Sequence, residues 1–314
     1  MNSQRNQHNF IAPIGIFCME KVGPWTGRWI VVCGGTSGLG LQIVIAAAQQ
    51  KTNLLIVGRD PARLEVAKAI AMDQGAISAI CYSIDLSPKE LSTSVRKSEE
   101  DDWFRLREWL STHNVDLLIN AVGRSDRGPL EQLSDTDLAS MFNDNLICTW
   151  NMIRATLESL KRARGTIVNI GSLAGLVSAP GMGGYSISKS ALTALSRQLR
   201  LELAGDGVHV LLVCPGPIAR EDSGTRYQKL AAQRGLANQP ATEAGGGVKL
   251  KLADPKRLCL KILDAAHRRQ KELVTPRKAA WLAAIANLWP SMADWILRKY
   301  IPFKTSQKYE RSET

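Results

Sequence analysis

The sequence predicts an α/β protein: a doubly wound, mostly parallel sheet with helices on both faces, followed by a C-terminal helical extension. Short apolar runs alternate with helical patterns along most of the chain, which is typical of parallel strands joined by crossover helices. These runs are apolar almost throughout, as in strands that are buried on both faces. The glycine-rich segment Gly34–Gly40 follows the first run and opens a helix, which is typical of a nucleotide-binding βα unit.

Seven apolar runs are the expected strands. They are Trp29–Cys33, Asn53–Val57, Ile77–Ile84, Val115–Asn120, Thr166–Ile170, Val208–Cys214 and a short seventh at Leu273–Thr275. Helices are expected between them, at Leu41–Gln50, Pro61–Gln74, Trp103–His113, Asp135–Arg162 and Tyr185–Leu203. Asp60 before Pro61 is a typical helix start, because an aspartate caps the first turn and proline suits its first position.

Three further segments complete the expected organisation. Residues 1–25 are expected to form an N-terminal arm, because their apolar stretch is too short to span a membrane and makes a poor signal peptide. Met19 is an alternative start, since the ordered pattern begins just after it. Residues 26–276 are expected to form the sheet domain. Within it, residues 217–251 are expected to close over a substrate, since long glycine-rich loops in compact domains are often lids. Residues 277–314 form a basic, tryptophan-rich tail.

Composition and charge exclude several classes of protein. The chain of 314 residues is 45% hydrophobic and 22% charged, which is typical of a globular protein and excludes global disorder. No apolar run reaches the roughly 18–20 residues of a spanning helix, which excludes a polytopic membrane protein. The six cysteines are scattered without metal-ligand spacing. We therefore expect no metal site, no disulfide framework and a reducing, cytoplasmic location.

Two polar patterns indicate chemistry beside the glycine-rich turn. Tyr185 and Lys189 are spaced to share one helix face, and a nearby ammonium lowers the pKa of a phenol toward the range useful for acid–base catalysis. Ser172 follows the strand Thr166–Ile170, at the carboxyl edge where open α/β sheets bind ligands. The glycines Gly34, Gly38 and Gly40 would let a pyrophosphate approach the helix N-terminus.

These motifs, with Asn120–Gly123 after the fourth strand and Cys214–Ile218 after the sixth, have the order and separations of one family. The chain resembles the short-chain dehydrogenase/reductase family of the Tyr-x3-Lys type over about Gly27–Pro276. The resemblance implies a Rossmann fold, a nicotinamide cofactor, a small-molecule carbonyl or alcohol substrate, and a homodimer or homotetramer.

The resemblance also implies four catalytic residues. Tyr185 would exchange a proton with the substrate oxygen, and Ser172 would hydrogen-bond that oxygen. Lys189 would bind the nicotinamide ribose and lower the pKa of Tyr185. Asn145 matches the asparagine that holds a proton-relay water; its neighbour Asn143 is an alternative, but the spacing from Ser172 favours Asn145.

The residues that the resemblance places on the cofactor follow the ends of successive strands. Asp85 and Leu86 would meet the adenine, and the segment after the sixth strand would pack near the nicotinamide. The full expected set is Gly34, Thr36, Ser37, Gly38, Leu39, Gly40, Arg59, Asp85, Leu86, Asn120, Ala121, Gly123, Tyr185, Lys189, Pro215, Gly216 and Ile218.

The end of the second strand predicts NADP(H), with NAD(H) as the less favoured alternative. NAD-preferring enzymes place an acidic residue there, whereas a basic residue accommodates the 2′-phosphate of NADP. Here Gly58 occupies the acidic position and Arg59 follows it, able to stack on adenine and to pair with phosphate. Ser37 can add a hydroxyl group to the side chains that accommodate this phosphate. Asp60 is an acidic residue near this position and so counts against NADP(H), but its role as a helix cap explains why it is there.

The tail allows two interpretations. Of the net charge of +11, residues 255–314 carry +8, with 13 basic and 5 acidic residues. Apolar residues recur there at helical spacing, and Pro290 should divide the segment into two helices. The apolar stripe comprises Trp281, Ile285, Leu288, Met292 and Trp295, with Leu282, Trp289 and Ile296 beside it. It could meet an anionic membrane, or it could dock on the domain or on a partner subunit.

We therefore expect an NADP(H)-dependent oxidoreductase that interconverts a ketone or aldehyde and an alcohol by hydride transfer. A hydrophobic substrate, lipid-like or steroid-like, or an acyl substrate is expected, but the sequence does not identify it. A non-enzymatic NADP-binding sensor or scaffold is the alternative, and nucleotide-sugar isomerase or epimerase chemistry is a third option. The glycine spacing resembles the reductase branch. Nucleic-acid binding is excluded, because no aromatic-interleaved basic surface or recognised module supports it.

Overall fold

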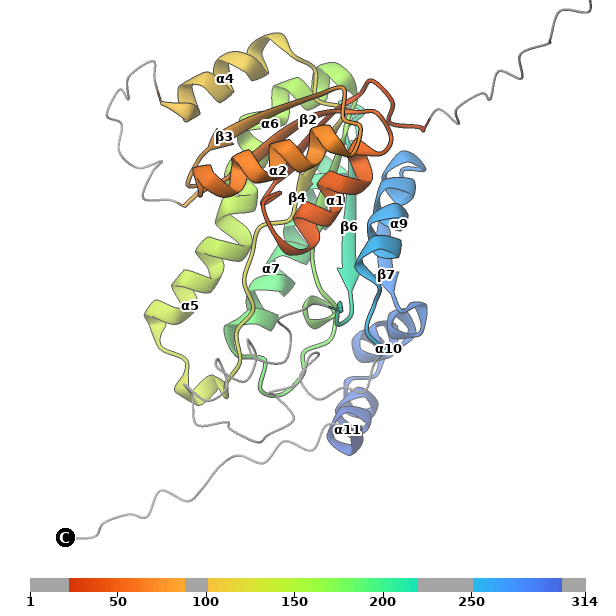
Figure 1. Ribbon diagram of the computed structural model, residues 1–314. Helices are drawn as coiled ribbons and strands as arrows, with labels where there is room; N and C mark the ends of the chain where they lie inside the picture. The colour runs from red at the N-terminus through yellow and green to blue at the C-terminus, as the bar shows by residue number, and fades with distance from the viewer. Residues whose placement is uncertain (1–22, 88–100, 220–250, 301–314) are drawn as a thin grey trace, which may run out of the picture.

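The fold is a seven-stranded parallel sheet covered by helices on both faces (Figure 1). The computed structural model describes residues 23–87, 101–219 and 251–300. Within these ranges the strands are ordered β3-β2-β1-β4-β5-β6-β7, and every neighbouring pair is parallel. Their bounds are β1 Trp29–Cys33, β2 Asn53–Gly58, β3 Ser78–Ser83, β4 Leu117–Asn120, β5 Thr166–Ile170, β6 His209–Pro215 and β7 Glu272–Thr275. This order confirms the doubly wound sheet. The chain adds strands toward one edge from β1 to β3 and toward the other edge from β4 on, so the strand order reverses between β1 and β4.

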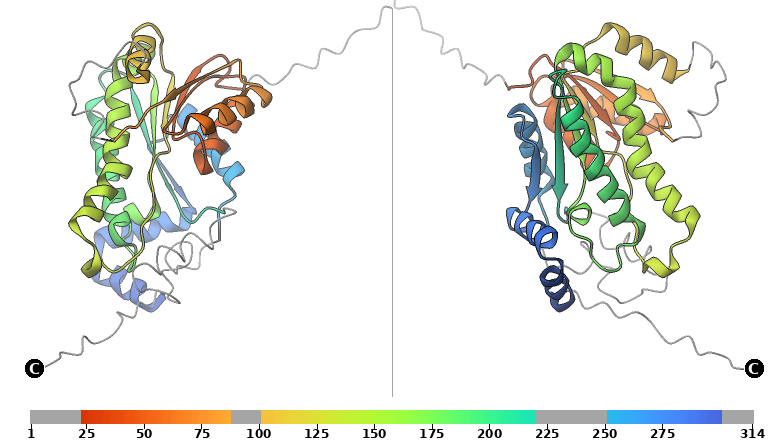
Figure 2. Two further views of the ribbon diagram at one scale, coloured as in Figure 1. Left: turned by 60° about the vertical axis from the view of Figure 1, so that its left-hand side comes forward. Right: turned by 180° about the vertical axis from the view of Figure 1, so that it is seen from behind.

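Two helical layers enclose the sheet, as Figure 2 shows from two further directions. One face is covered by α1 (Gly38–Ala48), α2 (Pro61–Asp73) and α9 (Pro255–His267). The opposite face is covered by α4 (Asp102–Thr112), α6 (Cys148–Ala163) and α7 (Gly183–Glu202). Buried apolar side chains on both sides of the inner strands explain why those strands are apolar almost throughout, whereas the edge strands β3 and β7 are mostly half-buried.

The structure departs from the expected helices in two places. The pattern at Asp135–Arg162 is not one regular helix: α5 (Asp135–Phe142) leads into a π-helical segment at Asn143–Ile147, and α6 follows. A π turn leaves the spacing of apolar residues close to that of an α-helix, so the periodicity of the sequence does not reveal it. The second departure is α9, which we did not predict. It begins as α2 does, with an aspartate cap at Asp254 and a proline in its first turn.

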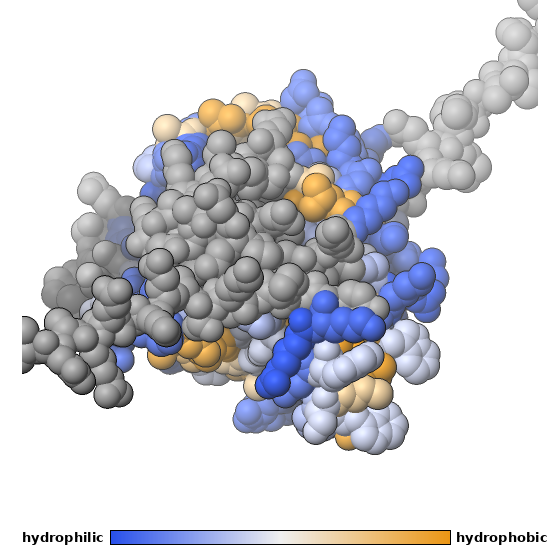
Figure 3. Space-filling model, turned by 90° about the horizontal axis from the view of Figure 1, so that it is seen from below, coloured by the Kyte–Doolittle hydropathy of each residue, from blue (hydrophilic) through white to orange (hydrophobic). Residues whose placement is uncertain are grey.

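Two helices, α10 (Arg277–Leu288) and α11 (Pro290–Tyr300), extend from the sheet domain, as the sequence predicts. The second helix begins at Pro290, whose ring suits a first turn and not a helix interior. Ala283 and Ala293 are buried, whereas large apolar side chains on these helices are exposed (Figure 3). No helix in the described ranges is both long enough and apolar enough to cross a bilayer.

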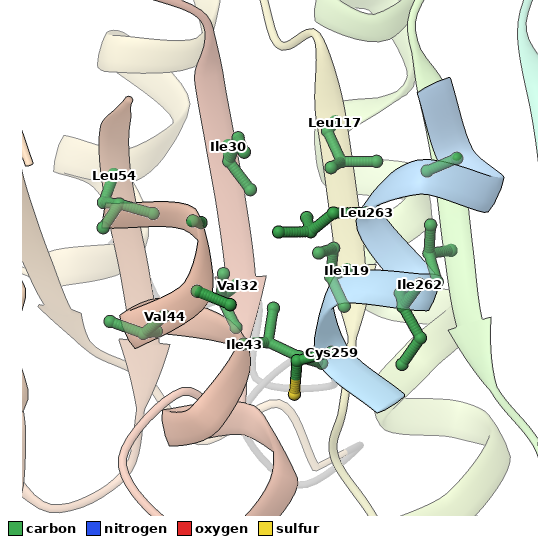
Figure 4. Packing of buried hydrophobic residues seen from close by; sticks show 14 of the residues in the cluster. Ile30, Val32, Ile43, Val44, Leu54, Leu117, Ile119, Cys259, Ile262 and Leu263 are labelled. Carbon is green, nitrogen blue, oxygen red and sulfur yellow. The ribbon is translucent and has the colours of Figure 1, made fainter. Parts of the chain in front are cut away.

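The core on the α1–α9 side shows how these residues pack (Figure 4). Side chains from β1 and β4, such as Val32 and Ile119, meet Ile43 of α1 and Ile262 of α9, and all four are fully buried. Trp25 joins this cluster: it is 6% exposed, and its indole N–H donates to the carbonyl of Leu263 at 3.0 Å. Packing of the described chain therefore begins before residue 26, where we expected the domain to start.

Four segments lie outside the described residues. They are most of the expected N-terminal arm (1–22), residues 88–100, most of the expected lid (220–250) and the last 14 residues of the expected tail (301–314).

Candidate active site

A cavity of about 700 Å³ lies at the carboxyl ends of the strands, where a parallel sheet binds its ligands. Of the residues predicted from the sequence, the following line it: Gly34, Thr36, Ser37, Leu39, Gly40, Arg59, Asp85, Leu86, Ala121, Gly123, Ser172, Tyr185, Lys189, Pro215, Gly216 and Ile218. The fold thus brings together residues from most of the strands and from α1 and α7. In the described structure, Gly38, Asn120 and Asn145 lie beside this lining.

The glycine-rich turn between β1 and α1 forms one wall. Gly34 has φ +79°, a left-handed conformation that favours glycine. At Gly40 a side chain would collide with the carbonyl oxygen of Gly34, so the helix can begin against the turn only with glycine there. In the described structure the hydroxyl of Ser37 makes no cap bond to α1. The first N–H groups of α1, the helix dipole and this hydroxyl suit an anionic group.

Two arginines border the cavity where β2 ends. Arg59 lines it directly after β2, and Arg63 lines it from the first turn of α2. Asp60 caps α2 by accepting from the backbone N–H of Arg63 at 3.2 Å, as expected, and also lies 3.3 Å from the Arg63 guanidinium. Asp60 therefore offsets part of the charge of Arg63, and Arg59 remains the nearest basic group to the end of β2.

Ser172 lines the cavity from the segment after β5, and Tyr185 lines it from α7. Ser172 is 8% exposed, and its Oγ accepts a hydrogen bond from the backbone N–H of Ala174 at 3.1 Å, which caps the 3-10 turn Leu173–Gly175. Because the oxygen accepts this bond, its own O–H remains able to donate. Tyr185 is half-buried in the first turn of α7, one helical turn before Lys189.

Lys189 is a buried cation beneath these two residues. Its side chain is 5% exposed, and Nζ donates to the carbonyl oxygen of Ile170 at 2.8 Å. Burial lowers the pKa of Lys189 to about 8, against a weaker opposing effect of Cys214. The ammonium is therefore fixed at the end of β5, on the α7 face that carries Tyr185.

This lowered pKa predicts how stability depends on pH. Between pH 8 and 10.5 the unfolded chain holds a proton that the folded Lys189 has lost, so unfolding becomes harder as pH rises. Relative to Lys189→Met, the wild-type free energy of unfolding should rise by roughly 2 kcal/mol from pH 7.5 to pH 10. Chemical denaturation of both proteins across this range measures it, and parallel curves would contradict a buried, titrating Lys189.

Asn145 lies in the π-helical segment and is fully buried. Its amide accepts from the backbone N–H of Arg124 at 2.8 Å and donates to the Arg124 carbonyl at 3.0 Å. It also donates to Ser188 Oγ at 2.9 Å, and Ser188 donates to the carbonyl of Tyr185. Asn145 therefore ties the loop after β4 to the first turns of α7.

Asn120 has a different environment from the one we expected. It is 1% exposed at the end of β4, and its amide donates to Asn169 on β5, which donates in turn to Ser196 on α7. These side-chain bonds cross-link β4, β5 and α7 beneath the cavity. The expected lining from this loop comes from Ala121 and Gly123.

Sequence reasoning missed several residues of the lining. Arg63, Arg124, Arg127 and Asp144 are polar members, and Arg124 forms an ion pair with Asp144. Apolar members come from the segment before α7 and from the C-terminal helices: Val177, Ala179, Met182, Ala279, Leu282, Ile296 and Leu297. Helical spacing had grouped Leu282 and Ile296 with the tail stripe, but periodicity alone could not show that this side faces the cavity.

Comparisons with known proteins agree with this arrangement. The family model described as short chain dehydrogenase matches residues 28–230. A ketoacyl reductase, HetN, of Nostoc sp. is 30% identical over 71% of this chain and 75% of its own length. The 11-beta-hydroxysteroid dehydrogenase 1A of Arabidopsis thaliana is 27% identical over 86% of this chain and 74% of its own length.

A solved structure shares the fold. It is an alcohol dehydrogenase from the archaeon Thermococcus sibiricus complexed with 5-hydroxy-NADP, and it aligns with a TM-score of 0.60 at 24% identity. The alignment covers 79% of this chain and 95% of that one. With the family match over most of the sheet domain, these findings show that the chain belongs to the short-chain dehydrogenase family, whose members are NAD(P)-dependent oxidoreductases acting on alcohol and carbonyl groups.

Proposed function

We propose that the chain is an NADP(H)-dependent carbonyl reductase for a hydrophobic ketone or aldehyde, and that Tyr185 is its general acid. The observation that carries the proposal is that Ser172, Tyr185 and Lys189 line one cavity together with apolar side chains. A family member that served only as a nucleotide sensor would have no need of this set. The same residues run the reverse oxidation of an alcohol when the cofactor ratio favours it.

A bound nicotinamide nucleotide supplies the hydride for reduction and accepts it in the reverse direction. Tyr185 donates its phenolic proton to the substrate oxygen as negative charge develops there. Ser172 donates a hydrogen bond to the same oxygen, which its bond from the Ala174 N–H leaves it able to do. The Lys189 ammonium stabilises the phenolate that remains, because opposite charges at short range favour the ionised form. The resemblance implies that Asn145 holds a proton-relay water; we propose instead that it is a positioning residue, because its amide is engaged by Arg124 and Ser188.

The preference for NADP(H) rests on the end of β2. A side chain at Gly58 would bring its Cβ to 2.9 Å from a methyl group of Thr36, so the acidic residue typical of NAD-preferring enzymes is excluded unless Thr36 moves. Arg59 and Arg63 border the same part of the cavity and can pair with a 2′-phosphate. Asp60 is engaged as the cap of α2 and so does not oppose this reading.

Arg59→Ala should raise the Michaelis constant for NADPH about tenfold. The substitution removes a charge-assisted contact worth roughly 1.5–3 kcal/mol, and NADH has no 2′-phosphate to lose it. NADH kinetics therefore serve as the internal control and should change little. A wild-type enzyme that already prefers NADH would contradict the cofactor assignment.

The substrate class follows from the apolar part of the cavity lining. Leucine, methionine, valine and isoleucine side chains from the segment before α7 and from α10 and α11 line the same cavity as Tyr185; they include Val177, Met182, Leu282, Ile296 and Leu297. Burial of an apolar substrate against them is favourable at roughly 25 cal/mol per Å². The relatives named as a ketoacyl reductase and a hydroxysteroid dehydrogenase support long acyl or steroid-like ketones as first candidates.

A screen of NADPH consumption tests the proposal. Steroid ketones, retinoids, keto-sphingoid bases, β-ketoacyl thioesters and small aldehydes should be compared at equal concentration, with NADH in parallel. We expect turnover with at least one hydrophobic ketone and little with small aldehydes. Tight NADPH binding without consumption for any carbonyl compound would favour the sensor or scaffold.

A further inference from the structure

The two C-terminal helices carry apolar side chains on two faces, and one face is exposed. Leu282, Ile296 and Leu297 line the cavity. The other face, here called the tryptophan face, consists of Trp281, Leu288, Trp289, Met292 and Trp295. Its three tryptophans are 75%, 59% and 60% exposed. The stripe expected from the sequence is thus divided between the cavity and the surface.

The tryptophan face is unusual within this chain. The other five tryptophans are all buried or half-buried, Trp25 and Trp103 among them. Figure 3, seen from below, shows large pale and orange side chains clustered beside deep-blue hydrophilic ones. A cluster of exposed tryptophan, leucine and methionine is costly in water and marks an interaction surface.

Basic side chains border the tryptophan face. Arg277, Arg298 and Lys299 are exposed at the far ends of α10 and α11, and Asp294 is the one acidic residue of the two helices. Lys278 is also exposed but lines the cavity. The Lys299 ammonium lies 5.0 Å from the centre of the Trp295 ring. Tryptophan prefers the boundary between lipid headgroups and acyl chains, and neighbouring lysine and arginine are attracted to anionic headgroups.

We propose that the tryptophan face docks on an anionic phospholipid surface, with the rings at the headgroup boundary and Arg277, Arg298 and Lys299 on lipid phosphates and carboxylates. A second copy of this chain fits the charges less well. In a two-fold pairing the face would meet itself and bring the basic side chains of both copies together, which opposes association. Docking on lipid would hold the helices that line the cavity against the membrane, whether or not the proposed reductase activity is correct.

Vesicle co-sedimentation of the full chain tests the proposal. The probes are phosphatidylcholine vesicles with and without phosphatidylserine, at low and high salt. We expect binding to the vesicles that contain phosphatidylserine, weaker binding in high salt because surface attraction is screened, and little binding to phosphatidylcholine alone. A full-length protein that sediments with neither vesicle type would overturn the proposal.

Three variants locate the contact. The triple change Trp281→Ser, Trp289→Ser and Trp295→Ser should abolish vesicle binding. Arg277→Gln, Arg298→Gln and Lys299→Gln together should weaken it about 100-fold, because each cation near an anionic surface contributes roughly fivefold. The matched control, Val66→Ser, Phe104→Ser and Leu201→Ser, removes exposed apolar side chains elsewhere and should bind like wild type.

Thermal melts and sedimentation velocity complete the test. Since the tryptophans are exposed, the serine variant should melt close to wild type. A much lower melting temperature would show that another part of the chain covers the face, and a wild-type dimer that the serine variant converts to a monomer would assign the face to a second copy. Either result, or a control variant that also loses vesicle binding, would refute the proposed lipid contact.

Discussion

Tyr185→Phe is expected to lower kcat by roughly 10²–10⁴-fold or more while NADPH binding stays nearly unchanged. The substitution removes the proton donor and keeps the ring, so the cavity wall and the first turn of α7 remain in place. Ser172 could still donate a hydrogen bond to the substrate oxygen and Lys189 would stay in place, but neither could replace the phenol as the proton donor. The effect should therefore fall on kcat and not on the affinity for the nucleotide.

Steady-state kinetics with the substrate identified by screening, together with NADPH titration by fluorescence, measure both quantities. The matched control is Tyr82→Phe, which makes the same change on β3, outside the cavity lining, and should leave turnover intact. Near-normal turnover by the Tyr185 variant would remove Tyr185 from the proposed mechanism, and loss of NADPH binding would show that the hydroxyl serves the cofactor instead.

Gly40→Ala is expected to destabilise the protein by roughly 3 kcal/mol or more and to abolish nucleotide binding. The added methyl group would collide with the carbonyl oxygen of Gly34 and lie 2.9 Å from its carbonyl carbon. Both are backbone atoms of the turn, so no side-chain rotation relieves the collision. Either α1 shifts away from the turn or the turn opens, and each movement disturbs the wall that faces the phosphates.

Thermal unfolding should show a decrease in melting temperature of roughly 10 °C for Gly40→Ala. Gly205→Ala is the control, because a side chain there meets nothing within 4 Å, and it should melt like wild type. A Gly40 variant that keeps both its melting temperature and its NADPH affinity would show that the close approach of α1 to the turn is not needed.

The strands were predictable because burial on both faces leaves a continuous apolar run in the sequence. Thr166–Ile170 agrees with β5 residue for residue, and Trp29–Cys33 agrees with β1. Helix interruptions leave a weaker signal: the π turn at Asn143–Ile147 adds one residue to a hydrogen-bonded ring without changing which residue types suit it. The helix α9 has a sequence signal that we did not use, an aspartate–proline start at Asp254 followed by apolar residues that the structure buries.

The candidate site was predictable where short motifs carry it. The glycine-rich turn, Ser172 and the pair Tyr185 and Lys189 keep fixed positions relative to strand ends, so the fold alone brings them to one cavity. The apolar wall was not predictable, because α10 and α11 reach the cavity only through the way they pack after β7. Arg63 was missed for a related reason: its approach to the cavity depends on how α2 packs against the end of β2.

Isotope transfer from the cofactor tests the central proposal most directly. The protein would be incubated with NADPH deuterated at the transferable position of the nicotinamide and with the best hydrophobic ketone from the screen, and the alcohol analysed by mass spectrometry. We expect one deuterium on the carbinol carbon of the product, formed by wild type and almost absent with Tyr185→Phe. An alcohol without deuterium, or no alcohol from any ketone despite tight NADPH binding, would contradict hydride transfer as the function of this chain.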